Sequence, residues 1–206
     1  MNRPQTINKL QREPPASALA KGCDILFLPC AGPQGTGEGS DFLARFLRGH
    51  LEPECRLLIP DMPDPENPHY KPWKKKFEHL LRDHGDDELL IIAHSLGASV
   101  VLKYLSENPP IKSIAGMFLI SAVYWGLENW EVAEFRFEMD FQRHLHYIPN
   151  IFFYHSKDDT VVPVSHLWHF AVALPDAVIR QFEHEGHLYV NGIPKLVEDI
   201  RSIGKW

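Results

Sequence analysis

The sequence predicts one α/β domain, a three-layer sandwich in which helices cover both faces of a mostly parallel sheet. Six short apolar segments rich in branched and aromatic residues alternate with longer segments of helical periodicity. The third to fifth apolar segments are apolar on both faces, as expected for parallel strands covered by helices. The chain of 206 residues is also long enough to bury one large core.

The predicted strands and helices follow one another along the chain. The strands are residues 23–30, 55–59, 88–93, 115–121, 151–155 and 177–182. The helices are about residues 40–51, 72–83, 96–108, 163–174 and 193–203. Pro109 and Pro110 end the third helix, because neither residue can donate the backbone hydrogen bond that a continuing helix needs.

The domain is predicted to span residues 23–206, with a small insertion at about 122–150. The insertion is longer than a plain connection between a strand and a helix and is rich in bulky aromatic residues. We expect it to contain one helix and to lie over the C-terminal edge of the sheet. Residues 1–22 are polar and lack the apolar region of a signal peptide, which predicts a loosely ordered N-terminal arm.

Composition excludes several classes of function. The net charge of -6 leaves no basic stripe for phosphates, so no nucleic-acid partner is predicted. No stretch reaches the ~18 apolar residues of a membrane span. Cys23, Cys30 and Cys55 are too few, and odd in number, for a disulfide framework. We therefore expect reduced core thiols and a cytoplasmic protein.

The strongest signal for chemistry is AHSLG at residues 93–97, where the third strand meets the third helix. A serine in such a tight turn is held out of the sheet, and the turn needs small residues two positions to either side. Ala93 and Gly97 meet this need. We predict Ser95 as the nucleophile and the Leu96 N–H, at the positive end of the helix, as an oxyanion donor. The alternative is a chance match to a loose pattern.

A serine nucleophile needs a histidine base and a carboxylate that orients the histidine. In α/β proteins with this turn, the acid and then the histidine follow the serine along the chain. Asp159 follows the fifth strand and His187 follows the sixth, and both strand ends lie at the edge where such sheets place their sites. We predict these two residues as acid and base. Gly186 supplies the backbone freedom that the histidine needs.

Neighbouring residues are assigned lesser roles. Asp158 is expected to point away from the base as a solvated loop charge. His184 lies close to its strand and is predicted to be a surface or supporting histidine. His94 and His155 are predicted to be structural hydrogen-bonding histidines of the core.

The second oxyanion donor is expected from the glycine-containing loop after the first strand. The Ala31 N–H is the predicted donor, with Cys30 and Gly32 as near alternatives. A phosphate-binding loop is the rival interpretation. The loop lacks the G-K-[ST] ending and the G-x-G-x-x-G spacing of nucleotide sites.

With these features in place, the chain resembles the α/β-hydrolase superfamily. More narrowly, it resembles compact serine hydrolases of the retinoblastoma-binding protein nine type. The narrower resemblance rests on MPDP at residues 62–65, Trp73, the Asp158-Asp159 pair and the small insertion. It implies a six- or seven-stranded sheet, with the six strands in the order 2-1-3-4-5-6, a Ser95–Asp159–His187 triad, and no metal or cofactor. Ala93 stands where most members have glycine.

The predicted function is hydrolysis of a carboxylic ester, thioester or activated amide of a small-molecule acyl substrate. Trp125, Trp130 and Phe135 are candidates for an apolar acyl pocket, with simple packing of the insertion as the equal alternative. His144 and His146 do not share a helix face, so no metal is assigned. A non-catalytic binding protein on the same scaffold and an acyltransferase with the same triad are the rival functions.

Overall fold

The computed structural model describes residues 23–84, 88–108 and 113–204. Within these ranges, six strands form one parallel sheet in the order β2-β1-β3-β4-β5-β6, which confirms the predicted order. The strands are β1 (Cys23–Leu28), β2 (Cys55–Leu58), β3 (Leu89–His94), β4 (Ile114–Ile120), β5 (Ile151–Ser156) and β6 (Val178–Phe182). The predicted N-terminal arm lies outside the described residues.

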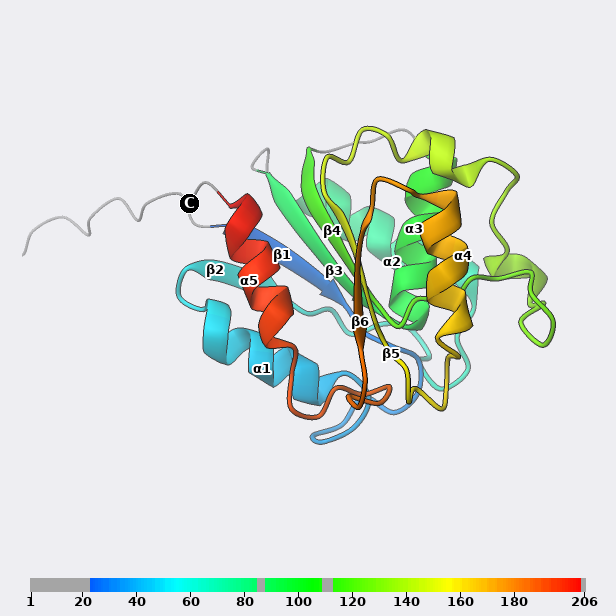
Figure 1. Ribbon diagram of the computed structural model, residues 1–206. Coiled ribbons are helices and arrows are strands. Elements are labelled where there is room, and N and C mark those ends of the chain that lie inside the picture. Colours follow the sequence, from blue (N-terminus) through cyan, green and yellow to red (C-terminus); the bar gives the residue numbers. More distant parts are fainter. Residues whose placement is uncertain (1–22, 85–87, 109–112, 205–206) are drawn as a thin grey trace, which may run out of the picture.

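Five α-helices in the described part of the chain cover the two faces of the sheet, as predicted. They are α1 (Asp41–Leu51), α2 (Tyr70–Asp83), α3 (Leu96–Glu107), α4 (Ser165–Ala173) and α5 (Pro194–Ile203). Helices α1 and α5 cover one face, and α2, α3 and α4 cover the other (Figure 1). Each connection between parallel strands therefore returns over one face of the sheet, and the strand C-termini meet at a common edge.

Strand β3 shows how the sequence builds this core. All six of its residues are buried. Leu90 and Ile92 pack in the cluster under α1 and α5, whereas Leu89, Ile91 and Ala93 pack in the cluster under α2, α3 and α4. The alternation follows from the two-residue period of a strand, and it requires an apolar residue at every position.

The insertion differs from its prediction. Residues 122–150 contain no α-helix and instead form two short 3-10 helices, η1 (Ala133–Phe135) and η2 (Phe141–His144). Asn129 and Asp140 have left-handed φ values of 67° and 64°. A right-handed helix cannot continue through a left-handed residue, so no helix runs past either position. The expected single helix in this segment was therefore wrong.

The cysteines also differ from their prediction. Cys23 and Cys55 are paired residues of β1 and β2 and form a disulfide, while Cys30 is free and buried. Neighbouring residues of adjacent strands bring two sulfur atoms within bonding reach, which a count of cysteines cannot show. The expectation of three reduced thiols was therefore wrong.

Candidate active site

Ser95 occupies the sharp turn between β3 and α3. Its φ of 54° and ψ of -117° lie in a region that non-glycine residues rarely adopt. The turn is held because the Ser95 N–H donates to the Ile120 carbonyl oxygen at 2.8 Å, while the Ser95 carbonyl accepts from Ala98 at 3.0 Å. The serine is only 8% exposed. This backbone presents the hydroxyl at the C-terminal edge of the sheet.

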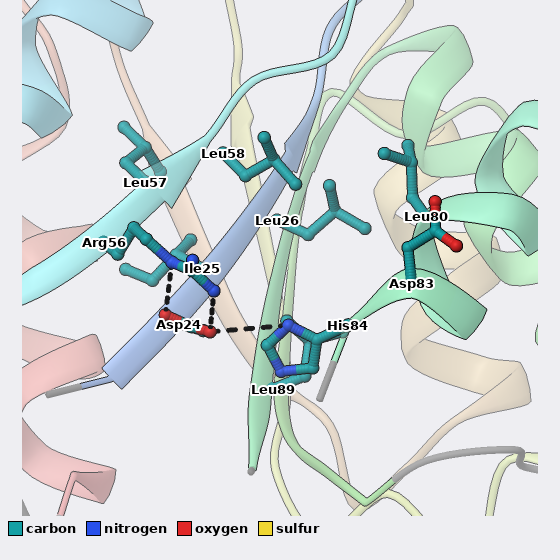
Figure 2. Close-up of a pocket in the computed structure, with 10 residues that line it drawn as sticks. All are labelled: Asp24, Ile25, Leu26, Arg56, Leu57, Leu58, Leu80, Asp83, His84 and Leu89. Carbon is teal, nitrogen blue, oxygen red and sulfur yellow. Dashed lines mark hydrogen bonds and ion pairs between the residues drawn. The ribbon is translucent and has the colours of Figure 1, made fainter. Parts of the chain in front are cut away.

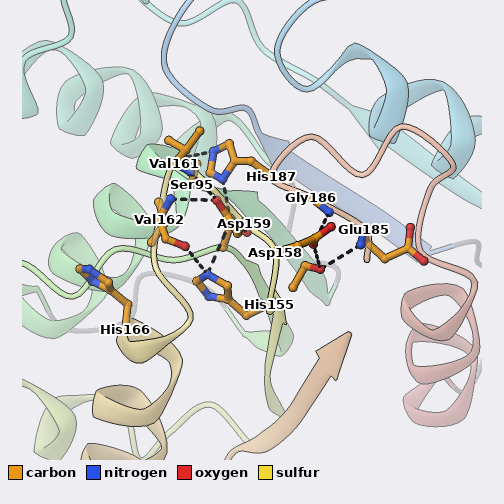
Figure 3. Close-up of polar contacts among 12 residues, drawn as sticks. Ser95, His155, Asp158, Asp159, Val161, Val162, His166, Glu185, Gly186 and His187 are labelled. Carbon is orange, nitrogen blue, oxygen red and sulfur yellow. Dashed lines mark hydrogen bonds and ion pairs between the residues drawn. The ribbon is translucent and has the colours of Figure 1, made fainter. Parts of the chain in front are cut away.

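Ser95, His187 and Asp159 meet at this edge (Figure 3). His187 Nε2 lies 3.1 Å from Ser95 Oγ, and His187 Nδ1 lies 2.8 Å from Asp159 Oδ2. The three side chains follow β3, β5 and β6, so residues distant in sequence meet because their strands are parallel. Both ring nitrogens of His187 are thus engaged, one by a hydroxyl and one by a carboxylate. The structure brings together the three residues that the sequence predicted.

The carboxylate of Asp159 is buried and fully hydrogen-bonded. Oδ1 accepts from the N–H groups of Val161 at 2.9 Å and Val162 at 2.8 Å, and Oδ2 also accepts from the Ser121 hydroxyl at 2.7 Å. Burial raises the pKa of Asp159, but the bonds and charge of His187 and the bonds from Ser121 and Val162 outweigh it and lower the pKa to about 2. The carboxylate is therefore ionised at neutral pH and available to orient His187.

Asp158 has a more specific place than the predicted solvated charge. It points away from the His187 imidazole, and Oδ1 accepts from the Gly186 N–H at 2.9 Å and the Ser156 hydroxyl at 2.5 Å. Ser156 Oγ in turn accepts from the Glu185 N–H at 2.9 Å. Hydrogen bonds from Ser156 and Gly186 lower the pKa of Asp158. The N–H groups of Glu185 and Gly186, the two residues before His187, are thus held by hydrogen bonds to side chains at the end of β5.

The other histidines near the site have no contact with the Ser95 hydroxyl. His94 is fully buried and bonds Ser40 and the His187 backbone, and His155 is buried with Nε2 2.8 Å from the Val162 carbonyl oxygen. The His184 side chain is 87% exposed. Burial lowers the pKa of both His94 and His155, so both rings are neutral at neutral pH. These observations agree with the structural and surface roles expected for them.

The loop after β1 narrows the choice of a second oxyanion donor. The Cys30 N–H donates to Ser40 Oγ at 2.8 Å, and the Gly32 N–H donates to the Pro65 carbonyl oxygen at 2.7 Å. Among the hydrogen bonds of the described residues, Ala31 N–H and Leu96 N–H have no acceptor. Of the three N–H groups considered from sequence, that of Ala31 is therefore the one without an acceptor among the described residues.

The aromatic residues of the insertion pack mainly against one another. Trp125 stacks on Phe135 with ring centroids 5.2 Å apart, and both are buried in the core cluster. Trp130 is only partly buried and contacts the His166 ring edge-on at 5.0 Å. Trp125 and Phe135 are thus buried by packing within the insertion, whereas Trp130 is the one of the three that is partly exposed.

A cavity of about 400 Å³ lies elsewhere, beside β1, β2 and the end of α2 (Figure 2). Arg56 and Asp24 form a bidentate ion pair at its rim. His84 Nδ1 lies 3.4 Å from Asp24 Oδ2. None of the predicted site residues lines it. Within the described ranges, no cluster of three metal-ligating side chains occurs and no helix is long and apolar enough to cross a bilayer.

Comparisons with known proteins identify a family model, a sequence relative and a structural relative of this chain. A family model described as Serine hydrolase matches residues 50–193, more than half of the chain. YdeN of Bacillus subtilis (strain 168) is 28% identical over 134 residues, which are 63% of this chain and 68% of YdeN. The crystal structure of the YdeN gene product has a TM-score of 0.70 at 19% identity, over 88% of this chain and 98% of that chain.

Two further solved structures share the fold. A serine hydrolase involved in carbazole degradation, CarC, has a TM-score of 0.68 at 16% identity, over 89% of this chain and 91% of its own. An esterase from Exiguobacterium antarcticum has a TM-score of 0.64 at 13% identity, over 88% of this chain and 92% of its own. At such low identity these likenesses establish the α/β-hydrolase fold and leave the substrate open.

Proposed function

Because this chain belongs to the serine hydrolase family, we propose that it cleaves a carboxylic ester, thioester or activated amide through an acyl-enzyme on Ser95. The observation that carries the proposal is the pair of hydrogen bonds that the His187 ring makes with Ser95 and Asp159. Ser95 Oγ lies 3.1 Å from His187 Nε2, and His187 Nδ1 lies 2.8 Å from Asp159 Oδ2. A hydroxyl, an imidazole and an ionised carboxylate in this order are what nucleophilic attack by a serine requires.

In the first half of the reaction, Ser95 Oγ attacks the substrate carbonyl carbon while His187 Nε2 takes the hydroxyl proton. Asp159 keeps the Nδ1–H tautomer of His187 and stabilises the imidazolium that forms. The tetrahedral intermediate then collapses and breaks the bond to the leaving group, which receives the proton from His187. The products of this half are the acyl-enzyme and an alcohol, thiol or amine.

The negative charge on the carbonyl oxygen needs donors that are in place before the reaction. We assign this role to the N–H groups of Leu96 and Ala31. Leu96 begins α3, so the positive end of the helix adds to its effect. A donor of this kind contributes ~3 kcal/mol of transition-state stabilisation.

In the second half, water attacks the acyl carbonyl while His187 takes a proton from the water. Collapse of the second intermediate returns the proton to Ser95 Oγ and releases a carboxylic acid. The residues at the site supply acid–base and electrostatic catalysis, and this mechanism assigns no step to a cofactor.

A fluorophosphonate probe tests the nucleophile directly, because only an activated serine reacts with it. We expect stoichiometric labelling at Ser95, and Ser95→Ala should remain folded and lose both labelling and p-nitrophenyl ester turnover. Tyr154→Phe is a matched control, since it removes a buried hydrogen bond to Asp199 from another part of the fold. An unlabelled but folded wild-type protein would favour the binding-protein alternative.

Product analysis decides the acceptor. With water as acceptor, a competing alcohol in the assay leaves the free acid as the main product, whereas an acyltransferase forms mainly the new ester.

A series of acyl chain lengths tests the acyl pocket. The short insertion predicts an open site and a preference for short acyl groups, and replacing the partly buried Trp130 with alanine should change KM more than kcat.

A further inference from the structure

His94 lies between the two loops that the proposed mechanism uses. Its Nδ1 is 2.8 Å from Ser40 Oγ, and the same hydroxyl oxygen accepts the Cys30 N–H at 2.8 Å. Its Nε2 is 2.9 Å from the backbone carbonyl oxygen of His187. One imidazole therefore joins the residue before Ala31 to the backbone of the proposed base.

The directions of these hydrogen bonds are fixed by the groups themselves. The His187 carbonyl oxygen can only accept, so His94 Nε2 must carry a proton and donate it. In a neutral imidazole the other nitrogen, Nδ1, then has no proton and accepts from the Ser40 hydroxyl. The Ser40 oxygen still has a lone pair for the Cys30 N–H, which can only donate. Every donor in the chain has one acceptor.

Burial supports the neutral form of His94. The side chain is 0% exposed, and burial together with the nearby charge of His187 lowers its pKa to about 3. The ring also lies 5.0 Å from the His187 ring and contacts the edge of Tyr189 at 6.2 Å between centroids. Close packing and two hydrogen bonds leave this imidazole one orientation.

We propose that His94 is a positioning residue that ties the oxyanion loop to the loop of the catalytic base. This inference rests on the proposed function, because it concerns how the oxyanion donor and the base are held in register. Ser40 fixes Cys30 and so sets the direction of the adjacent Ala31 N–H. The His187 carbonyl is fixed from the same ring, while Asp158 and Ser156 hold the preceding residues from the other side.

Two substitutions separate the two contacts of the ring. His94→Asn places an amide oxygen near Nδ1, so it keeps the bond from Ser40 and loses the donor to His187. His94→Gln places an amide nitrogen near Nε2, so it keeps the bond to His187 and loses the acceptor for Ser40. Each change should lower the fluorophosphonate labelling rate and kcat ~10-fold, with KM nearly unchanged, since each removes about one hydrogen bond that orients the site.

Ser40→Ala completes a pair of double-mutant cycles. With His94→Asn, which still contacts Ser40, the fold-losses in kcat should multiply. With His94→Gln, which has already lost that contact, the double variant should lose clearly less than the product of the two single losses. A residue that only fills space gives no such difference between the two cycles.

The ¹⁵N chemical shifts of the His94 ring give a readout independent of turnover. We expect a proton on Nε2 and an accepting Nδ1 throughout pH 6–8. The inference is overturned if the proton is on Nδ1, if both cycles behave alike, or if the variants lose stability while kcat and labelling stay at the Tyr154→Phe level. Failure of the proposed function is distinct, because it leaves wild-type Ser95 unlabelled.

Discussion

The Pro29 carbonyl oxygen lies so close to Gly97 that a Cβ on Gly97 would be only 2.5 Å from it. The Leu28 carbonyl oxygen would be 2.7 Å from the same Cβ. Both oxygens are backbone atoms and cannot rotate away. The glycine two residues after Ser95 is therefore required by the end of β1, which packs against the start of α3.

We expect Gly97→Ala to push the loop after β1 away from α3 and to displace the Ala31 N–H with it. Overpacking of this kind costs ~1–3 kcal/mol of stability, and misplacement of an oxyanion donor should lower kcat at least ~10-fold. Ester turnover and urea unfolding measure the two effects. Gly49→Ala in α1 is the control, because nothing lies within 4 Å of a Cβ there. Equal kcat in both variants would contradict the argument.

The adjacent carboxylates Asp158 and Asp159 should differ sharply in effect. Asp159→Asn cannot hold the productive tautomer of His187, and kcat should fall ~10⁴-fold. Asp158→Ala removes the acceptor for the Gly186 N–H and the Ser156 hydroxyl and an exposed contact with His184, so kcat should fall ~10-fold or less. Steady-state kinetics on folded variants measure both. A larger loss for Asp158→Ala would reverse the assignment of the acid.

Acid should destabilise the fold through its buried histidines. The pKa of His94 falls from 6.5 in the unfolded chain to about 3, and burial lowers the pKa of His166 to about 4. Their stabilising effect is fully present above pH 6.5 and is lost as the pH falls, because only the unfolded chain then binds these protons. Asp159 acts in the same direction only below pH 3.8.

The free energy of unfolding should therefore drop between pH 7 and pH 5 by about 2 kcal/mol for each such histidine. Urea unfolding at a series of pH values measures this. His94→Asn should be less stable at pH 7 but should show a shallower decline toward pH 5. An identical slope in wild type and variant would show that His94 titrates normally in the folded protein.

The disulfide predicts a definite thiol count. In guanidinium chloride without reductant, one thiol, that of Cys30, should react, and after reduction all three should. The bridge joins residues separated by 32 positions, so Cys55→Ser should cost ~3–4 kcal/mol of stability. Three reactive thiols before reduction would contradict the bridge. Because disulfides are rare in the cytosol, a count of one reactive thiol before reduction would argue against the predicted cytoplasmic location.

Much of the fold followed from simple patterns. Strand β3 is apolar throughout because both of its faces are covered, and that pattern is visible in the sequence. The turn at Ser95 was recognisable because its small neighbours are a steric requirement. The predicted first strand ran to residue 30, whereas β1 ends at Leu28. Pro29 cannot donate a ladder hydrogen bond, and the Cys30 N–H goes to Ser40 instead.

The supporting serines could not be predicted in the same way. Ser40 precedes α1, where a serine usually caps the helix, but its hydroxyl makes no cap bond and binds across the fold. Ser121 and Ser156 stand at the ends of β4 and β5. Ser121 binds Asp159, 38 positions away, and Ser156 binds Glu185, 29 positions away, as well as Asp158 in the adjacent loop. Single polar residues have no periodicity, so such partners emerge only when the strands are aligned.

The alignment of strands also determines when the protein can first become active during folding. Ser95 and His187 are 92 positions apart, and they meet only after β3, β4, β5 and β6 have paired in register. Parallel pairing of distant segments is slow, because the entropy of closing long loops must be lost before the contacts form. Recovery of turnover after dilution from denaturant should therefore lag behind recovery of helical circular dichroism, which makes activity a stringent reporter of complete folding.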